Sequence, residues 1–178
     1  MRLPDAIDML ADSGVDALGP TTWADLGCGD GTFTLALASL LAPGSTIHAM
    51  DRDASALRTI ALEHHGVRIN RHRQDFTNLS WPFEALSGIL MANSLHYVED
   101  QAGFLRGCAA RMVVPRRFLI VEYDAENASR WVPYPVSQTR LRTLFQAAGY
   151  SIRILRSRPS IYRRAALYSA AIGTSMPL

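Results

Sequence analysis

A glycine-rich loop near the N-terminus constrains the fold more than any other stretch of this chain. The loop is Asp25-Leu26-Gly27-Cys28-Gly29-Asp30-Gly31, between a short apolar run and a segment with helical character from Thr32 to Leu41. Glycines lack a Cβ atom, so such a loop turns tightly and brings backbone N–H groups close to a ligand. The first turn of the next helix adds unpaired N–H donors and a positive dipole end, which attract a phosphate or carboxylate.

Two classes of ligand are bound by loops of this kind. A dinucleotide site uses the spacing G-x-G-x-x-G, whose third glycine lets the helix pack on the strand. Here the spacing is G-x-G-x-G, Thr32 stands at the position of that third glycine, and Asp25 precedes Gly27 by two residues. A carboxylate there repels a pyrophosphate but can face a cationic amino acid moiety. The loop therefore favours a cofactor with an amino acid part over a nicotinamide dinucleotide.

Length and composition indicate an ordinary globular protein. The chain has 178 residues, of which 48% are hydrophobic and 19% charged, so we expect a single domain over residues 1–178. No apolar run approaches the roughly 18 residues of a membrane span, and acids near the start argue against a secretory signal. Cys28 and Cys108 lie in unrelated contexts and are interpreted as reduced thiols of a cytoplasmic protein. No metal site is predicted.

Hydrophobic patterning alternates strands with helices along the chain. Five strand–helix units are followed by two β-like stretches, Tyr150–Arg156 and Tyr162–Ile172, separated by Arg158-Pro159-Ser160, which predict an antiparallel pair. Ser137 is predicted to cap the last helix and Gly149 to end it. The other predicted strands are 21–25, 46–50, 66–71, 87–92 and 116–123, and the other predicted helices are 4–11, 32–42, 54–65 and 100–112, with a loop or short helix at 81–86.

The second predicted strand ends in an acidic residue. Asp51 lies about 20 residues past the glycines, where a carboxylate can accept hydrogen bonds from both hydroxyls of a ribose. Asp53 is interpreted as the cap of the next helix. The double histidine His64-His65 is predicted to be an exposed end of that helix. Because ribose is common to both cofactor classes, Asp51 supports the fold more than the choice of cofactor.

The D-x-G-x-G-x-G loop resembles the cofactor loop of the class I S-adenosylmethionine-dependent methyltransferases. The order of elements resembles this family over nearly the whole chain. The resemblance implies an α/β fold, a doubly wound Rossmann-like sheet of seven strands, mostly parallel with an antiparallel last strand and with helices on both faces. It also implies S-adenosylmethionine as cofactor and methyl transfer by direct displacement as the reaction.

The resemblance also implies roles for individual residues. Gly27 and Gly29 would hold the amino acid part of the cofactor, and Asp25 would order the loop and face its ammonium group. Asp51 would hold the ribose, Asp75 the adenine amino group, and the residue after Asp75 would contribute a backbone N–H. The predicted cofactor-binding residues are Asp25, Gly27, Cys28, Gly29, Asp51, Arg52, Asp75, Phe76 and Asn93.

The fourth predicted strand ends in Asn93-Ser94-Leu95-His96-Tyr97, at the tip that would face the transferable methyl group. This segment resembles that of small-molecule methyltransferases and departs from the Asn/Asp-Pro-Pro-Tyr segment of enzymes that methylate exocyclic or amide nitrogens. His96 is the predicted catalytic residue, a general base, because imidazole can titrate near neutral pH. The alternative is a histidine at a helix start that is hydrogen-bonded to the backbone.

The predicted substrate contacts are aromatic. Two prolines forbid a regular element in residues 124–136, so we interpret this segment as a candidate substrate loop. Tyr97, Trp131 and Tyr134 are the predicted substrate residues, although packing over the edge of the core is an alternative. Glu122 is a further candidate for contact with the acceptor. The leading helical segment, residues 1–20, could cap the cofactor site or merely cover the sheet.

Three hypotheses for the function stay open at this point. The first is methyl transfer to a small-molecule acceptor. The second is an RNA methyltransferase, because arginines dominate after Asp100, although these arginines are dispersed rather than clustered with aromatics. The third is a non-catalytic module that binds S-adenosylmethionine. The sequence predicts neither the acceptor nor the oligomeric state.

Overall fold

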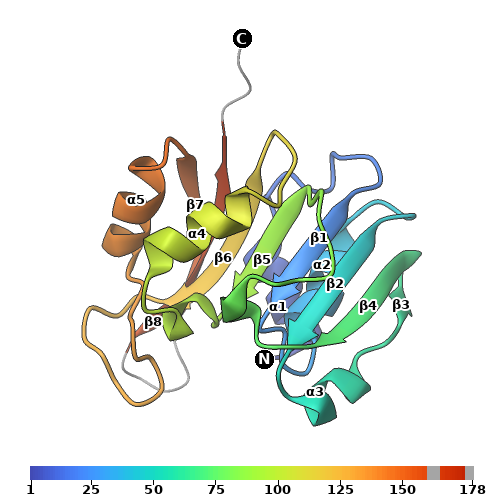
Figure 1. The fold of residues 1–178 in the computed structure, drawn as a ribbon, viewed down its shortest axis with the longest axis horizontal. Helices are drawn as coiled ribbons and strands as arrows, with labels where there is room; N and C mark the ends of the chain where they lie inside the picture. The colour runs from blue at the N-terminus through green and yellow to red at the C-terminus, as the bar shows by residue number, and fades with distance from the viewer. Residues whose placement is uncertain (160–164, 175–178) are drawn as a thin grey trace.

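One mixed β-sheet forms the centre of the molecule (Figure 1). The structure is a computed structural model that describes residues 1–159 and 165–174. The strand order is β3-β4-β2-β1-β5-β6-β8-β7. The strands are β1 (Thr22–Leu26), β2 (Thr46–Asp51), β3 (Glu63–His64), β4 (Val67–Arg73), β5 (Gly88–Ala92), β6 (Arg117–Tyr123), β7 (Ser151–Pro159) and β8 (Ala166–Gly173).

The strand directions confirm the doubly wound arrangement. Strands β4, β2, β1, β5 and β6 are parallel to one another, whereas β8 runs antiparallel between β6 and β7. The antiparallel last strand is therefore confirmed. The described residues form eight strands rather than the predicted seven, because the short β3 pairs antiparallel with β4. Arg158 and Pro159 lie inside β7 rather than between the strands, and the predicted start at Tyr162 lies outside the described residues.

Helices cover both faces of the sheet, as predicted. In Figure 1, α4 and α5 lie in front of the sheet, with α1 and α2 behind it. No helix in the described part of the chain is long and apolar enough to cross a membrane. The helices are α1 (Leu3–Leu10), α2 (Thr32–Leu40), α3 (Ala54–Thr59), α4 (Gln101–Ala109) and α5 (Gln138–Gln146), with the 3₁₀ turns η1 (Phe76–Asn78) and η2 (Leu95–Tyr97).

The predicted helix over residues 54–65 is wrong in its second half. It ends at Thr59, and the segment His64-His65 belongs to β3 and its turn rather than to a helix end. His65 and Gly66 have φ angles of +50° and +74°, the two-residue left-handed turn that closes a tight hairpin. Arg71 of β4 donates two hydrogen bonds to carbonyl oxygens at the end of α3, so a tertiary contact replaces a longer helix.

The capping predictions are confirmed. The Asp53 carboxylate accepts from two backbone N–H groups at the start of α3, and the Ser137 hydroxyl accepts from the Arg140 N–H at the start of α5. Gly149 follows α5 with a φ of +80°, a left-handed conformation that terminates a helix.

The leading helix is held against the sheet by ion pairs with β7. Arg158 lies 3.1 Å from the Asp5 carboxylate, and Arg156 contacts Asp12 at 2.7 Å and Asp8 at 3.4 Å. Three apolar residues of α1 are buried against the sheet, and two more are partly buried. Exposed pairs of this kind contribute about 0–1 kcal/mol each. These arginines of the basic C-terminal part therefore contact α1 instead of forming an open basic surface.

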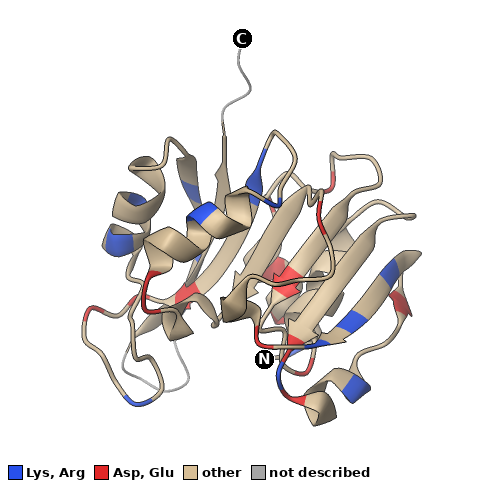
Figure 2. Ribbon diagram, viewed as in Figure 1, with Lys and Arg blue, Asp and Glu red and all other residues tan. Residues whose placement is uncertain are grey.

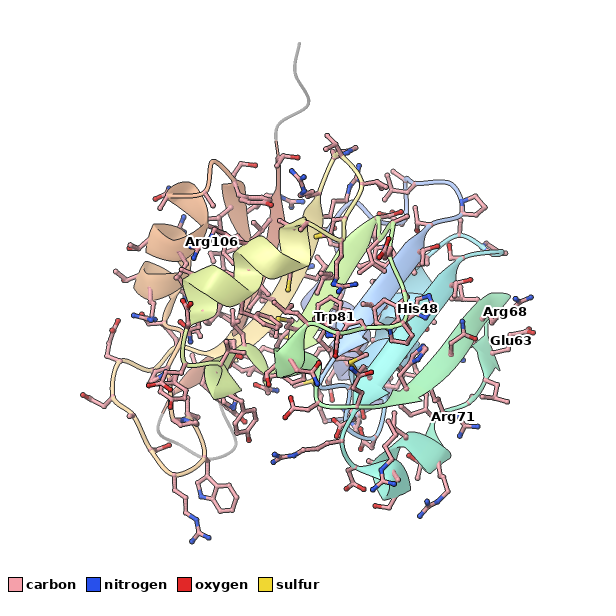
Figure 3. The ribbon with its side chains drawn as sticks, in the orientation of Figure 1. His48, Glu63, Arg68, Arg71, Trp81 and Arg106 are labelled. Carbon is pink, nitrogen blue, oxygen red and sulfur yellow. The ribbon has the colours of Figure 1, made fainter. Side chains whose placement is uncertain are left out.

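Two histidines share a hydrogen bond on the sheet face that α4 and α5 leave open. His48 Nδ1 and His72 Nε2 are 2.9 Å apart, and the Phe83 ring stacks on His48 at 4.3 Å. Residues 79–87 form a loop rather than a helix and cover this region, with Trp81 on the loop near His48 (Figure 3) and Phe83 between the two rings. Burial, together with the neighbouring His72, lowers the pKa of His48 to about 4.

This depressed pKa predicts a loss of stability in mild acid. The unfolded state binds a proton at His48 near pH 6.5, whereas the folded state does so only near pH 4, so stability falls as the pH decreases between these values. Because His48 is partly exposed, we expect a loss of about 1 kcal/mol, or about 2–4 °C in Tm. Thermal unfolding at pH 7.5 and pH 4.5 would measure it. His48→Gln should reduce the dependence of Tm on pH. His65→Asn, at an exposed histidine, is the control and should leave that dependence unchanged. If His48→Gln lost as much stability in acid as the native chain, the assignment to His48 would be contradicted.

Candidate functional site

The glycine loop connects the end of β1 to the start of α2 by a backbone path that requires glycine. Gly27 and Gly31 have φ angles of +77° and +82°. A Cβ atom on Gly27 would lie 2.6 Å from the Cβ of Ser94, and one on Gly31 would lie 2.6 Å from the Ile60 side chain. Gly29 faces open space instead. The two outer glycines are thus required for packing, and the middle one presents backbone to a ligand.

Asp51 ties the end of β2 to this loop. Its Oδ2 accepts a hydrogen bond of 2.9 Å from the Gly29 N–H, and its Oδ1 accepts one of 2.8 Å from the Asp53 N–H. The carbonyl oxygen of Met50 accepts from the Gly27 N–H at 2.8 Å. The end of β2 therefore fixes the conformation of the loop that follows β1.

Asp25 is a fully buried carboxylic acid with one oxygen unpaired. Its Oδ2 accepts a 2.6 Å hydrogen bond from the Thr34 hydroxyl, but its Oδ1 has no partner among the described residues. Burial, with a smaller contribution from the nearby Asp51 carboxylate, raises the pKa of Asp25 to about 7. A cationic group beside Oδ1 would restore the ionised form at neutral pH.

Two cavities adjoin at the carboxyl ends of the parallel strands, with volumes of about 240 and 380 Å³. Gly27 and Asn93 line both of them, so the two cavities meet at the tips of β1 and β5. All nine predicted cofactor-binding residues line one or both cavities. Sequence reasoning missed other lining residues, among them Met1, Phe33, Ala92, Gln74, Thr77 and Ser94, because they carry no motif.

Asn93 adopts a left-handed conformation where the two cavities meet. Its φ is +55°, and its N–H donates to the Val121 carbonyl oxygen at 2.8 Å, which ties the tip of β5 to β6. Its side-chain Oδ1 is buried and finds no hydrogen-bond partner in the part of the chain that the structure describes. A residue other than glycine or asparagine is rarely found in this conformation. Asn93 therefore presents a polar acceptor to the site.

Asp75 lines the larger cavity. It caps η1, accepting from the Thr77 N–H at 2.9 Å and from the Thr77 hydroxyl at 2.8 Å. These hydrogen bonds hold the pKa of Asp75 below its usual value. The carboxylate is exposed to the cavity beside the buried Phe76 ring.

His96 lies in η2 and is bonded to a carboxylate rather than to the backbone, unlike the helix-start alternative. The side chain is 2% exposed, and its Nδ1 is 2.7 Å from Glu122 Oε2. Its own backbone N–H donates to Glu122 Oε1 at 3.2 Å. Within residues 1–159 and 165–174, nothing bonds to His96 Nε2. Neither of the two cavities is lined by His96, whose ring lies against Tyr97 at 4.4 Å.

The irregular segment 124–136 is confirmed, and its C-terminal part is anchored beside η2. The Tyr134 N–H donates to the His96 carbonyl oxygen at 3.0 Å, and the Gln101 side chain donates to the Tyr134 carbonyl oxygen at 2.9 Å. The packing alternative applies to Val132 and Val136, which are buried. It does not apply to Trp131, which is 73% exposed.

Comparison with known proteins identifies the family. A sequence profile described as a methyltransferase domain matches residues 24–115, just over half of the chain. The chain therefore belongs to the methyltransferase domain family. A search of curated proteins found no match.

Solved structures share the fold at low sequence identity. The magnesium protoporphyrin IX methyltransferase ChlM of Synechocystis PCC 6803, with bound SAM, is 16% identical with a TM-score of 0.66 over 97% of this chain and 78% of its own. The plantazolicin methyltransferase BpumL, in complex with SAH, is 13% identical with a TM-score of 0.66 over 97% and 83%. The YcgJ protein of Bacillus subtilis is 12% identical with a TM-score of 0.67 over 98% of both chains. The predictions of a class I methyltransferase and of S-adenosylmethionine as its cofactor are confirmed.

The buried Asp25 predicts that its removal stabilises the protein. The folded pKa of about 7 lies above the usual 3.8, so the carboxyl group costs stability as the pH rises through this range. Asp25→Asn should raise the free energy of unfolding by on the order of 2 kcal/mol at pH 8, after allowance for a buried amide, and by less at pH 5. Urea unfolding at both pH values would measure it. Asp30→Asn, at an exposed carboxylate of the same loop, serves as the control and should not give this increase. If Asp25→Asn were less stable than the native chain at pH 8, the buried Asp25 carboxyl group would not be a cost to stability.

Proposed function

We propose that this methyltransferase transfers the methyl group of S-adenosylmethionine to a small-molecule acceptor. The observation that carries the proposal is the pair of adjoining cavities that share Gly27 and Asn93 at the tips of β1 and β5. The cofactor supplies an electrophilic methyl group on a sulfonium, so the chain has only to bind, orient and exclude water. In our proposal the whole of residues 1–178 acts as one domain, with the leading segment 1–20 at the edge of the smaller cavity through Met1.

The smaller cavity suits the amino acid part of the cofactor. The unpaired Oδ1 of Asp25 offers a buried anionic oxygen to an ammonium group, which supports that assignment. Gly27, Cys28 and Gly29 offer close backbone approach on the same wall. Asn93 offers its unpaired Oδ1 near the junction with the larger cavity. Together these groups fit a zwitterionic amino acid better than a phosphate.

The larger cavity suits the nucleoside part. Each oxygen of Asp51 accepts one backbone N–H, and a carboxylate oxygen has a second lone pair for a ribose hydroxyl. Arg52 lines the same wall. In our proposal Asp75 accepts from the adenine amino group, and the Phe76 backbone N–H donates to the base.

We assign general-base catalysis to His96 and a positioning role to Glu122. The bond from His96 Nδ1 to Glu122 directs the Nδ1 proton to the carboxylate, so the lone pair of the neutral ring is on Nε2. An acceptor that loses its proton during attack can pass it to Nε2. Tyr97, Trp131 and Tyr134 would contact the acceptor beside this ring, with segment 124–136 as the substrate loop.

Removal of the Asp51 carboxylate should weaken cofactor binding. Asp51→Ala deletes the acceptor for ribose and the partner of the Gly29 N–H, so we expect a loss of about 1–3 kcal/mol, or about 5- to 150-fold in Kd. Titration calorimetry with S-adenosylmethionine and S-adenosylhomocysteine would measure it, with NAD as a ligand that should not bind. Glu84→Gln, an exposed acid on another loop, is the matched control. Unchanged affinity in a folded Asp51→Ala protein would exclude the ribose assignment.

Removal of the His96 imidazole should affect turnover more than cofactor binding. We expect His96→Gln to lower methyl transfer by about 10²-fold or more, the usual contribution of a general base, with unchanged affinity for S-adenosylhomocysteine. Transfer of radiolabelled methyl to a panel of small amines and phenols would provide the assay. A native protein that binds the cofactor tightly but methylates none of them would favour the non-catalytic module.

A further inference from the structure

The charge at the ligand edge of the sheet is opposite in sign to that of the whole chain. The formal net charge is +2, with 16 acidic residues. Ten of these acids lie at or just beyond the carboxyl ends of the parallel strands. Five arginines of the described residues accompany them at this edge, and one of the five, Arg158, pairs with Asp5. The five arginines are Arg52, Arg58, Arg73, Arg130 and Arg158. The ten acids are Asp25, Asp30, Asp51, Asp53, Asp75, Glu99, Asp100, Glu122, Asp124 and Glu126.

Four of these acids flank the proposed acceptor site and have no role toward the cofactor. Glu99 and Asp100 follow η2, and Asp124 and Glu126 begin the segment after β6. Arg130 is the only arginine in residues 93–101 and 124–136, all of which the structure describes. Figure 2 shows the loop between β6 and α5 with acidic segments and one basic segment at its tip. An approaching cation is attracted to this edge, whereas an anion is repelled.

The exposed aromatic side chains of the described residues gather on the same two segments. Trp131 is 73% exposed, Tyr97 50% and Tyr134 36%, whereas the other large exposed hydrophobic residues are aliphatic and lie elsewhere. The face of an aromatic ring carries negative potential and attracts cations. The guanidinium of Arg130 already lies 5.6 Å from the centre of the Trp131 ring, so this ring attracts a cation in the structure.

The buried imidazole of His96, with one nitrogen lacking a hydrogen-bond partner among the described residues, lies beside these rings. His96 packs against Tyr97, its backbone is bonded to Tyr134, and its Nε2 has no partner within the described chain. An unsatisfied buried nitrogen is costly, which indicates that a ligand group completes it. This observation is independent of the charge distribution and points to a ligand that donates a hydrogen.

From these observations we infer that the methyl acceptor is a small organic amine that arrives as an ammonium cation. The inference rests on the proposed function and specifies the class of its substrate. The acidic edge attracts the cation, and the faces of Tyr97, Trp131 and Tyr134 surround it. The same charge disfavours RNA, whose phosphates would meet acids at this edge while Arg156 and Arg158 pair with α1.

Methyl transfer to an amine can be written with every bond and proton accounted for. The ammonium first releases one proton to solvent, which exposes the nitrogen lone pair. That lone pair forms the new N–C bond to the methyl carbon while the S–C bond breaks and its electrons stay on sulfur as a neutral thioether. The nitrogen then carries a positive charge and gives its excess proton to His96 Nε2.

Three probes that differ only in the charge of one terminal group test the inference. Tyramine, tyrosol and 4-hydroxyphenylacetate carry an ammonium, a hydroxyl and a carboxylate on the same phenol. Each is titrated by calorimetry into protein saturated with S-adenosylhomocysteine, at low and high salt. We expect tyramine to bind at least about 10-fold more tightly than tyrosol, the carboxylate to bind weakest, and the preference to shrink with salt.

Two substitutions test which residues are responsible for the tighter binding of the ammonium probe. Glu126→Gln and Trp131→Leu should each weaken tyramine binding about 3- to 10-fold, since each removes one attraction for the cation. Glu84→Gln, an exposed acid away from the site, should leave it unchanged. Equal binding of the three probes, tighter binding of the carboxylate, or binding of none to the loaded protein would overturn the amine assignment. Failure to bind S-adenosylhomocysteine at all would instead overturn the proposed function.

Discussion

The hydrogen bond from the Gly29 N–H to the Asp51 carboxylate is the contact on which the site depends. It joins the tips of β1 and β2, and the same carboxylate also accepts from Asp53 at the start of α3. With both oxygens bonded, the side chain is held at the edge of the larger cavity while the loop keeps its left-handed glycines. The cofactor site that we propose is therefore pre-formed, and we expect binding there to cost little conformational entropy.

Three buried polar atoms at the ligand edge of the sheet lack hydrogen-bond partners among the described residues. Asp25 Oδ1, Asn93 Oδ1 and His96 Nε2 are the buried side-chain polar atoms that lack partners in residues 1–159 and 165–174, and all three follow or end a strand at the ligand edge. Each of them costs stability in the free protein. Such a pattern is typical of a site in which ligand groups supply the missing partners.

Motif-bearing residues could be predicted, and residues that act through tertiary contacts could not. The glycine loop and Asp51 are identified by their spacing from strand ends, and Asp75 by the resemblance to the methyltransferases. All of them line the two cavities. Glu122 was a candidate for contact with the acceptor, but its bond to His96 could not be predicted, since it joins positions 26 residues apart. The helix over 54–65 was overpredicted because Arg71, which ends it, lies on a later strand.

The sequence by itself determined the class of fold, the cofactor loop and the ends of most elements, because glycines, caps and apolar runs act over a few neighbouring residues. Only the tertiary structure decided which acids face a cavity, which arginines pair with α1, and which nitrogen of His96 is left without a partner. Those outcomes depend on burial and on contacts between strands distant in sequence. The negative ligand edge of a net positive chain follows from strand order, which brings ten scattered acids to one side of the sheet.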